Sequence, residues 1–363
     1  MTRSIYPIQK NGRSSMFSPI HAAFALTILV SPLVAEEPIE PEKPVDYGKI
    51  AFYPKRWAEN KVDPHLTPWS GNEIVFLTAG SDFDRKIMTK MLERLDSGWE
   101  LYARLTGKRP RTFKHLLGQP TIAAVPKGNL SCGIGCGYIG ATGIEVAGFY
   151  GQDYKMLQRD IEAMPHYYFY EMGRNFYTFG PRHSLFITGF AVFMRYVCMD
   201  TLKCHDPEKE LRRKIDLAEA QFAESDMSFL KGFTTKDGLG EKAPRLKNDK
   251  GKHIHPSDQP VIYASAMLKL WRDHGGNEWL KRFYRELAGC EPVPPKTKED
   301  AIKQSLIWMV AASCAAKEDL SPVFADRWRM PMSPVARKKM AAINWEEEGL
   351  SAAKLMKEVM AVD

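Results

Sequence analysis

The sequence has no marked compositional bias. Its 363 residues include six cysteines, 26% charged residues and 44% hydrophobic residues. These values exclude intrinsic disorder, collagen and a small cysteine-rich fold as descriptions of the whole chain. The sequence also lacks an internal repeat, a G-x-S-x-G motif, a P-loop and a dinucleotide-binding glycine motif. The length is that of two domains or one large domain.

Acidic residues are absent from the first 35 positions, which contain Arg3, Lys10 and Arg13. An apolar run, Ala22–Val30, follows these basic residues and leads to an acidic, proline-rich stretch. This order is typical of a secretory signal peptide, so residues 1–35 are expected to be removed after Ala35 and the protein exported to the periplasm or the extracellular space. An uncleaved membrane anchor is the alternative; after cleavage we expect no membrane span.

The charge of the mature chain is only mildly positive. Removal of the leader takes away three basic residues and lowers the formal net charge from +7 to +4. This small surplus is not the electrostatic footprint of a nucleic-acid-binding protein, so we expect no nucleic acid partner. The local basic run Gly107–Lys114 is interpreted as a solvated loop after a helix.

All six cysteines follow the leader, and an even number in an exported chain favours disulfides. Their spacing suggests one of fifteen possible sets of pairs. The alternative is a zinc knuckle built from the first two cysteines and one later pair, although C-x5-C is an unusual ligand spacing. The suggested pairs are Cys132–Cys136, Cys198–Cys204 and Cys290–Cys314.

The hydrophobic pattern predicts an α+β fold, with a small mixed α/β subdomain over 71–151 and a mainly helical subdomain over 152–345. Residues 36–70 are expected to be a linker with irregular structure, and 346–363 a C-terminal helix. Strands are predicted over 72–80 and 121–126, a hairpin over 137–151, and a long loop over 226–258. Helices are predicted over 83–105, 152–164, 165–179, 184–200, 208–225, 259–274, 276–288, 298–316 and 350–360.

The segment Pro165–Gly180 carries the clearest chemical signal. Seven of the fourteen residues from His166 to Phe179 are aromatic, so the simplest interpretation is a buried core helix. Its residue order is also that of H-E-x-x-H, the zinc-peptidase motif in which two histidines bind the metal and the glutamate is the general base. Here the frame reads Tyr170-Glu171-Met172-Gly173-Arg174, with the glutamate present and both histidines replaced.

Two further segments extend this pattern. SLFITGFAVFMRY (Ser184–Tyr196) resembles the second helix of gluzincin peptidases, with Thr188 in the place of the third ligand, a glutamate. Ser305–Ser333 resembles the closing helix and D-L-(S/T)-P-x-F segment of enhancin-like gluzincins. The resemblance covers about residues 70–335 and implies a zincin-like fold of the enhancin type.

The resemblance also implies that the metal site is lost. Tyr170, Arg174 and Thr188 replace all three zinc ligands, and no acidic residue lies between Asn175 and Met199 to supply another. An arginine stays protonated, so Arg174 brings a fixed positive charge to the place of the metal and is expected to pair with Glu171. We therefore predict no zinc cofactor and a vestigial catalytic Glu171.

The function expected from these residues is that of a pseudopeptidase, which binds an extended peptide or a glycoprotein in the retained cleft through Tyr170, Arg174, Thr188 and His166. An edge strand in the 137–151 hairpin is expected to pair with the ligand. One alternative is an active hydrolase that uses Glu171 with Tyr170 or an unconventional metal, and another is a purely structural protein. Weaker metal candidates are His166 with His183 and Glu171, and the pair His253 and His255.

Overall fold

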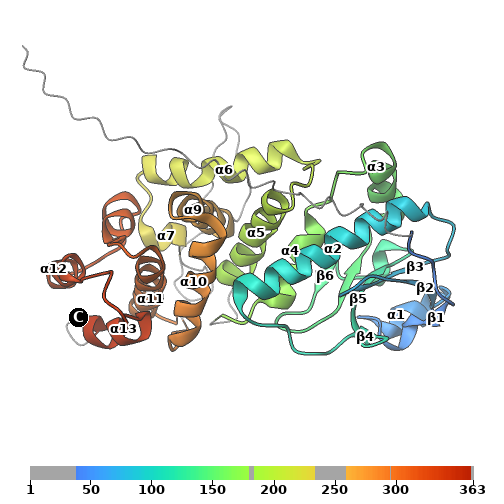
Figure 1. Cartoon of the computed structure of the whole chain (residues 1–363), viewed down its shortest axis with the longest axis horizontal. Helices are drawn as coiled ribbons and strands as arrows, with labels where there is room; N and C mark the ends of the chain where they lie inside the picture. The colour runs from blue at the N-terminus through green and yellow to red at the C-terminus, as the bar shows by residue number, and fades with distance from the viewer. Residues whose placement is uncertain (1–37, 180–183, 234–258, 295, 361–363) are drawn as a thin grey trace, which may run out of the picture. The chain divides into compact units, whose positions relative to one another are not determined.

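The computed structural model describes residues 38–179, 184–233, 259–294 and 296–360 (Figure 1). The predicted signal peptide, His183, His253 and His255 lie outside these residues. Within the described ranges, none of the helices is both long and apolar enough to cross a membrane. The fold is mixed α/β, as the sequence predicted; among the described residues, strands and helices alternate up to Val146 and helices follow from there on.

A mixed sheet of seven strands forms the N-terminal part, in the order β1-β2-β3-β5-β7-β6, with β4 paired to β5. The pairs β3–β5 and β5–β7 are parallel, and the remaining pairs are antiparallel. The strand β6 therefore lies at an edge of the sheet. The strands are β1 (Val45–Asp46), β2 (His65–Ser70), β3 (Val75–Thr78), β4 (His115–Leu116), β5 (Gln119–Ala124), β6 (Gly135–Gly137) and β7 (Ile144–Val146).

Both faces of this sheet are covered, and because side chains alternate along each strand, neighbouring residues belong to different cores. In β3, Phe76 belongs to the large hydrophobic core on the side of the long helices, whereas Val75 and Leu77 belong to a smaller core on the other side. The smaller core includes Tyr47 and Trp57, which lie in a short 3₁₀ helix (Tyr47–Lys49) and in α1 (Pro54–Glu59). The segment 36–70, predicted to be irregular, thus supplies two strands and a covering layer.

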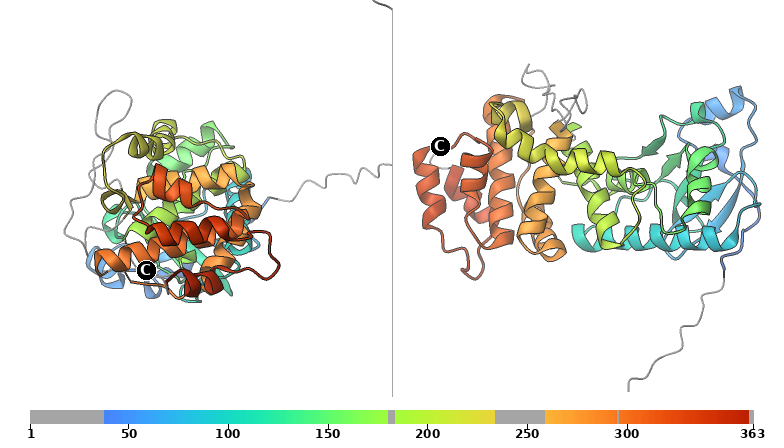
Figure 2. Two further views of the ribbon diagram at one scale, coloured as in Figure 1. Left: turned by 90° about the vertical axis from the view of Figure 1, so that its left-hand side faces the viewer. Right: turned by 90° about the horizontal axis from the view of Figure 1, so that it is seen from above.

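The helix α2 (Arg85–Thr106) joins the sheet to the helical part. It begins two residues after the predicted start, with Asp84 as the N-cap, whose side chain accepts a hydrogen bond from the Ile87 N–H. It ends at Gly107 with φ +66°, as the sequence predicted. Figure 2 shows α2 running from the strands toward α10, with which it is in contact.

Helices make up most of the chain after residue 153. The helix predicted over 152–164 is shorter in the structure. The helix α7 lies in the segment predicted to be a loop, and α12 lies in a segment for which no helix was predicted. The helices are α3 (Tyr154–Arg159), α4 (Tyr167–Phe176), α5 (Ser184–Thr201), α6 (Lys209–Glu224), α7 (Phe229–Phe233), α9 (Gln259–Asp273), α10 (Gly276–Gly289), α11 (Lys298–Ala316), α12 (Pro334–Ala342) and α13 (Ala352–Met360).

The predicted hairpin 137–151 is wrong in its position. The structure pairs Gly135–Gly137 with Ile144–Val146, and the chain then enters a π-helical turn over Phe149–Asp153. The pairing begins earlier because glycines at 135 and 137 allow the strand to lie directly on α4, where a Cβ would collide with that helix.

One of the three predicted disulfides forms in the structure. Cys132 is bonded to Cys136, whereas the other four cysteines are free thiols. The thiol of Cys198 is fully buried and close enough to Cys204 for that neighbour to raise its pKa, after the larger effect of burial. Cys314 is likewise close to Cys290, and burial is again the first cause of its raised pKa. The predicted pairs Cys198–Cys204 and Cys290–Cys314 are therefore neighbours but not bonded here.

The helices α4 and α5 cross closely and run antiparallel. Phe190 of α5 packs on Tyr177 just after α4, whereas Arg195, further along α5, lies beside His166 at the start of α4. At the crossing between these points, a Cβ on Gly173 would lie 3.0 Å from the Cα of Ala191. A side chain at 173 would push α4 away from α5.

Replacement of Gly173 by valine should therefore lower the free energy of unfolding by about 2 kcal/mol, the scale of overpacking in a core. The measurement is the urea midpoint followed by circular dichroism. Gly128→Val is the matched control, because no other atom lies within 4 Å of the point that a Cβ on Gly128 would occupy. Equal losses in the two variants would contradict the close crossing.

Candidate functional site

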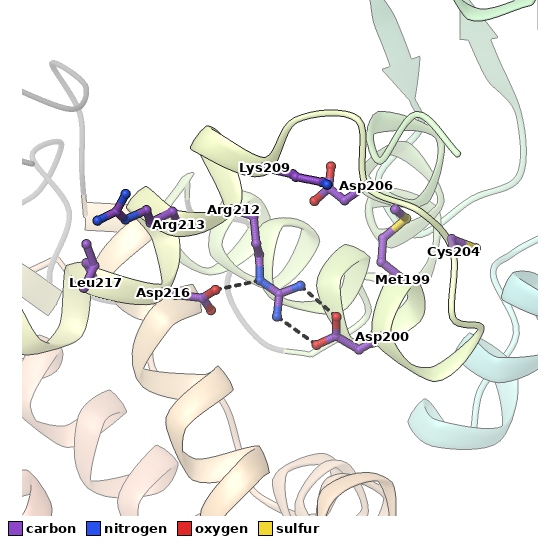
Figure 3. Close-up of a pocket in the computed structure, with 9 residues that line it drawn as sticks. All are labelled: Met199, Asp200, Cys204, Asp206, Lys209, Arg212, Arg213, Asp216 and Leu217. Atoms are coloured by element: carbon purple, nitrogen blue, oxygen red, sulfur yellow. Dashed lines mark hydrogen bonds and ion pairs between the residues drawn. The ribbon is translucent and has the colours of Figure 1, made fainter. Parts of the chain in front are cut away.

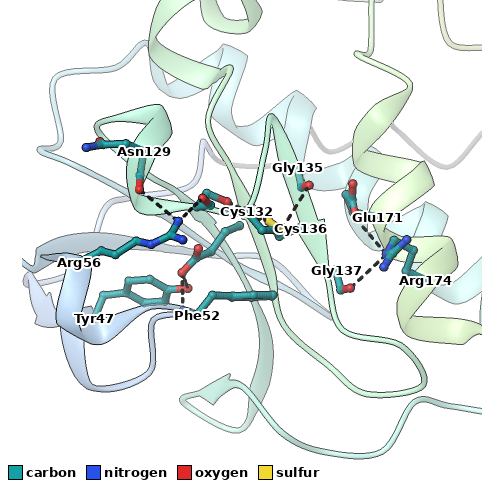
Figure 4. The surroundings of a disulfide bond; sticks show 12 residues. Tyr47, Phe52, Arg56, Asn129, Cys132, Gly135, Cys136, Gly137, Glu171 and Arg174 are labelled. Atoms are coloured by element: carbon teal, nitrogen blue, oxygen red, sulfur yellow. Dashed lines mark hydrogen bonds and ion pairs between the residues drawn. A yellow bond between two sulfur atoms is a disulfide. The ribbon is translucent and has the colours of Figure 1, made fainter.

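The carboxyl group of Glu171 lies beneath the edge strand β6 rather than in an open cleft (Figure 4). Glu171 is on the second turn of α4 and is buried. A Cβ at Gly135 would lie 2.8 Å from Glu171 Cγ, and one at Gly137 would overlap the Glu171 carbonyl oxygen. The two glycines thus bring the strand backbone into direct contact with the glutamate.

The outward edge of β6 is partly occupied by α4. Hydrogen bonds join β7 to β6 at two points, from Ala147 N–H to the Ile134 carbonyl and from Tyr138 N–H to the Gly143 carbonyl. In an antiparallel pair only every second residue bonds to the neighbouring strand, so the N–H and carbonyl of Gly137 point away from β7. The Gly137 carbonyl accepts a hydrogen bond from Arg174 Nε at 3.2 Å. The Gly137 N–H faces Glu171 and lowers its pKa. Together, Glu171 and Arg174 stand where a neighbouring strand would pair.

Glu171 and Arg174 also form the ion pair that the sequence predicted. The Arg174 Nε lies 3.6 Å from Glu171 Oε2, which is too long for a good hydrogen bond, and Oε2 has no other hydrogen bond of normal geometry among the described residues. Burial raises the pKa of Glu171 to about 7, against the smaller lowering by Arg174 and Gly137. Desolvation therefore outweighs the attraction of the arginine.

The end of α4 fixes the turn between β6 and β7. The Arg174 carbonyl accepts from the Gly140 N–H at 3.0 Å. Asn175 Nδ2 donates to the carbonyls of Tyr138 at 2.9 Å and Gly143 at 3.2 Å. These contacts end the helix at Phe176, three residues before the predicted end. Sequence reasoning missed Asn175, although a buried amide in an aromatic helix is a signal of such a role.

A second buried carboxyl lies on the opposite face of the same hairpin. Glu145 of β7 accepts hydrogen bonds from the Tyr47 hydroxyl at 3.0 Å and the Phe52 N–H at 2.8 Å. Burial raises its pKa to about 7, although these two donors lower it. Glu145 thus attaches the N-terminal layer to the sheet, as Glu171 attaches α4. No motif drew attention to this residue in the sequence.

Tyr170 and His166 do not join Glu171 but surround Arg195 of α5. The Arg195 Nη1 lies 3.1 Å from His166 Nδ1, and its guanidinium carbon is 5.8 Å from the centre of the Tyr170 ring. His166 Nε2 lies 3.0 Å from a Glu208 carboxylate oxygen. Burial, followed by the charge of Arg195, lowers the pKa of His166. Arg195 is only 7% exposed, and no sequence pattern indicated a role for it.

Thr188 is half-buried on α5, two turns before Arg195. In the described part of the chain, no side-chain hydrogen bond connects Thr188 to Tyr170, Glu171 or Arg174. The residues at the ligand and base positions of the zinc-peptidase motif are therefore divided: Glu171 and Arg174 form one group, and Tyr170 belongs to the Arg195 group.

A charged cavity of about 280 Å³ lies beyond this group (Figure 3). Its Arg212 donates to both carboxylate oxygens of Asp200 at 2.8 Å and to Asp216 at 2.9 Å, and its guanidinium lies over the Tyr196 ring. The arginine is fully engaged by these partners, so the cavity is a network of ion pairs rather than an open anion site.

Zinc does not fit the residues of the motif. Among the residues that the structure describes, no three histidine, cysteine, aspartate or glutamate side chains are grouped to hold a metal. Arg174 directs a fixed positive charge at Gly137, and Tyr170 lies beside a second arginine. Neither arrangement offers a negatively charged ligand atom to a metal cation. The absence of zinc stays a prediction for elemental analysis.

Comparison with known proteins gives no family. No family model and no curated protein matches the chain. A solved structure described as a functionally unknown conserved protein from Bacillus anthracis str. Ames aligns with a TM-score of 0.50 at 11% identity, and a mutant of such a protein aligns at 0.49 and 11%. Each alignment covers 79% of this chain and 53% of the other. The chain therefore spans about half the length of these structures, and the likeness concerns the fold alone.

The two buried carboxyls predict an unusual pH dependence of stability. Their folded pKa of about 7 lies above the ordinary value of 4.5, so the folded protein binds more protons between these values. By linkage, the free energy of unfolding falls as the pH rises from about 4.5 to about 7, by up to about 3 kcal/mol for each group. Glu171→Gln should make this decline shallower in urea unfolding at pH 5 and pH 8.

The exposed Glu59 of α1 provides the control, and Glu59→Gln should keep the wild-type decline. An unchanged decline in Glu171→Gln would show that the carboxyl is not held in the buried position described.

Proposed function

We propose that the protein is an exported, non-catalytic relative of gluzincin metallopeptidases, a pseudopeptidase that binds an extended peptide or a glycoprotein without cleaving it. The observation that carries this proposal is the position of Glu171 beneath β6, engaged with Gly137 and Arg174. A general base must reach a water molecule beside the substrate. Here the side chain that would do so is covered by backbone.

The energetics also disfavour hydrolysis. Water that is not bound to a metal has a pKa near 15.7, whereas that of Glu171 is about 7. Full transfer of a proton across this gap costs about 12 kcal/mol, which a metal would largely remove. The motif residues provide no ligand set for such a metal.

The half-buried Gly135 end of β6, which Arg174 does not reach, supports the binding role. The backbone N–H and carbonyl of Gly135 point away from β7, as those of Gly137 do, but the Gly135 carbonyl does not bond to Arg174. An extended peptide can pair with an exposed strand edge through its backbone. Ile134, 55% exposed beside this edge, offers an apolar contact. The bonded pair Cys132–Cys136 holds this segment and is compatible with an exported protein.

One observation favours the alternative of an active hydrolase. A pKa of about 7 is suited to a general base at neutral pH, so a movement of β6 that uncovered Glu171 would expose a competent base. This alternative predicts cleavage that depends on Glu171, whereas the pseudopeptidase predicts none.

The decisive assay incubates the mature protein and Glu171→Gln with casein and with a mixed peptide library. We expect no cleavage by either protein and no stoichiometric zinc in elemental analysis. Cleavage by the wild type that disappears in Glu171→Gln would establish the hydrolase instead.

Binding is tested separately by capturing library peptides on the immobilised protein and identifying them by mass spectrometry. Ile134→Glu should reduce the captured peptide about tenfold, because it places a charge beside the edge. Val335→Glu is the matched control, since Val335 is an equally exposed apolar residue of α12. Capture that is absent in the wild type, or equal in both variants, would contradict the binding role.

A further inference from the structure

Three cavities follow one another along the helices α10 and α11. The inner cavity, of about 20 Å³, shares Phe179, Leu287 and Gln304 with a middle cavity of about 110 Å³. The middle cavity shares Cys290, Pro292 and Ile307 with an outer cavity of about 480 Å³. Each adjoining pair shares three lining residues, so the cavities lie next to one another, and we call this row of cavities the α10–α11 groove.

The inner end of the groove is aromatic and contains a buried polar group without a partner. Tyr263 and Phe190 belong to its wall. Tyr284 is 1% exposed, and its hydroxyl makes no hydrogen bond to any described residue. Burial raises the pKa of Tyr284, so the hydroxyl keeps its proton and can act as a donor. A buried hydroxyl without a partner costs free energy unless a ligand or water satisfies it.

The middle of the groove adds a cation and an amide. Lys108 lines this cavity with its ammonium group 5.3 Å from the centre of the Phe179 ring, and it forms no ion pair with a described residue. The Gln304 amide oxygen accepts from the Val293 N–H at 3.0 Å, which turns the amide into a fixed part of the wall. Lys108, Gln304 and Tyr284 are thus among the polar residues that line the two adjoining inner cavities, and Lys108 is positively charged.

The outer cavity is lined mainly by apolar groups. Burial, followed by Glu286, raises the pKa of Cys290 to about 11, so its thiol is neutral at physiological pH. The exposed side chains of Glu291 and Lys357 stand at its rim, one of each charge. A volume of 480 Å³ lies in the range of sites for small ligands. The apolar lining residues are Pro292, Val293, Pro294, Ile307, Ala353 and Met356.

We propose that the α10–α11 groove binds a long-chain fatty acid. The carboxylate lies at the junction of the inner and middle cavities, where Lys108 supplies the charge and the Tyr284 hydroxyl a hydrogen bond. The alkyl chain follows Leu287 and Ile307 into the outer cavity, where burial of each methylene is favourable. An extended peptide fits less well, because the lining gives its backbone groups few partners. This proposal is independent of the peptide-binding role of β6.

The test uses the delipidated mature protein and the fluorescent fatty acid cis-parinaric acid, displaced by palmitate or by hexadecanol. The wild type should bind the probe and release it to both competitors. Lys108→Ala should weaken palmitate about tenfold and leave hexadecanol unchanged, because only the carboxylate uses the charge. Lys49→Ala, which changes an exposed lysine near the N-terminal layer, should match the wild type.

A second variant tests the outer cavity without altering the buried core. Ala353→Trp adds a large side chain on α13 at the cavity wall and should weaken both competitors at least tenfold. Ala58→Trp on the exposed side of α1 is its control, and circular dichroism confirms the fold of each variant. Absence of displaceable binding by the wild type, or equal affinities in Ala353→Trp, would overturn the proposal. Equal losses for palmitate and hexadecanol in Lys108→Ala would overturn the assigned position of the carboxylate.

Discussion

The contact between the glycine strand β6 and the helix α4 is the constraint on which the candidate site depends. Because Gly135 and Gly137 have no side chains, the strand lies directly on Glu171. Arg174 then reaches the outward carbonyl of Gly137, and Asn175 holds the turn that leads to β7. One helix thus determines the position of the hairpin, and the hairpin covers the carboxyl group that a peptidase would need in the open.

This arrangement carries an energetic cost at neutral pH. Moving a carboxylate out of water costs several kcal/mol, and a neighbouring arginine offsets that cost only with close geometry. At 3.6 Å the ion pair of Glu171 and Arg174 is loose, and the pKa of Glu171 remains raised to about 7. Glu145 has the same raised value on the opposite face of the hairpin. Two buried carboxyls therefore position this hairpin, although neither is well compensated when ionised.

Periodicity and turn residues predicted much of the fold, including α2 with its end at Gly107 and most of the later helices. The pair of Glu171 and Arg174 followed from their spacing of three residues on a helix. The hairpin register could not be predicted, because it depends on how close a strand can lie to α4. The grouping of His166 and Tyr170 around Arg195 depends on the crossing of α4 and α5, which no local pattern encodes. For the same reason, spacing suggested cysteine pairs that are neighbours but not bonded.

The central claim is that Glu171 fastens β6 instead of activating water, and hydrogen exchange of the Gly137 amide tests it directly. This amide lies on the outward edge of the sheet, where an unpaired N–H exchanges quickly with solvent. We expect it to be protected in the wild type, and to lose that protection in Glu171→Ala while the amides of β7 keep theirs. A Gly137 amide that exchanges freely in the wild type, or that remains equally protected in Glu171→Ala, would contradict the account.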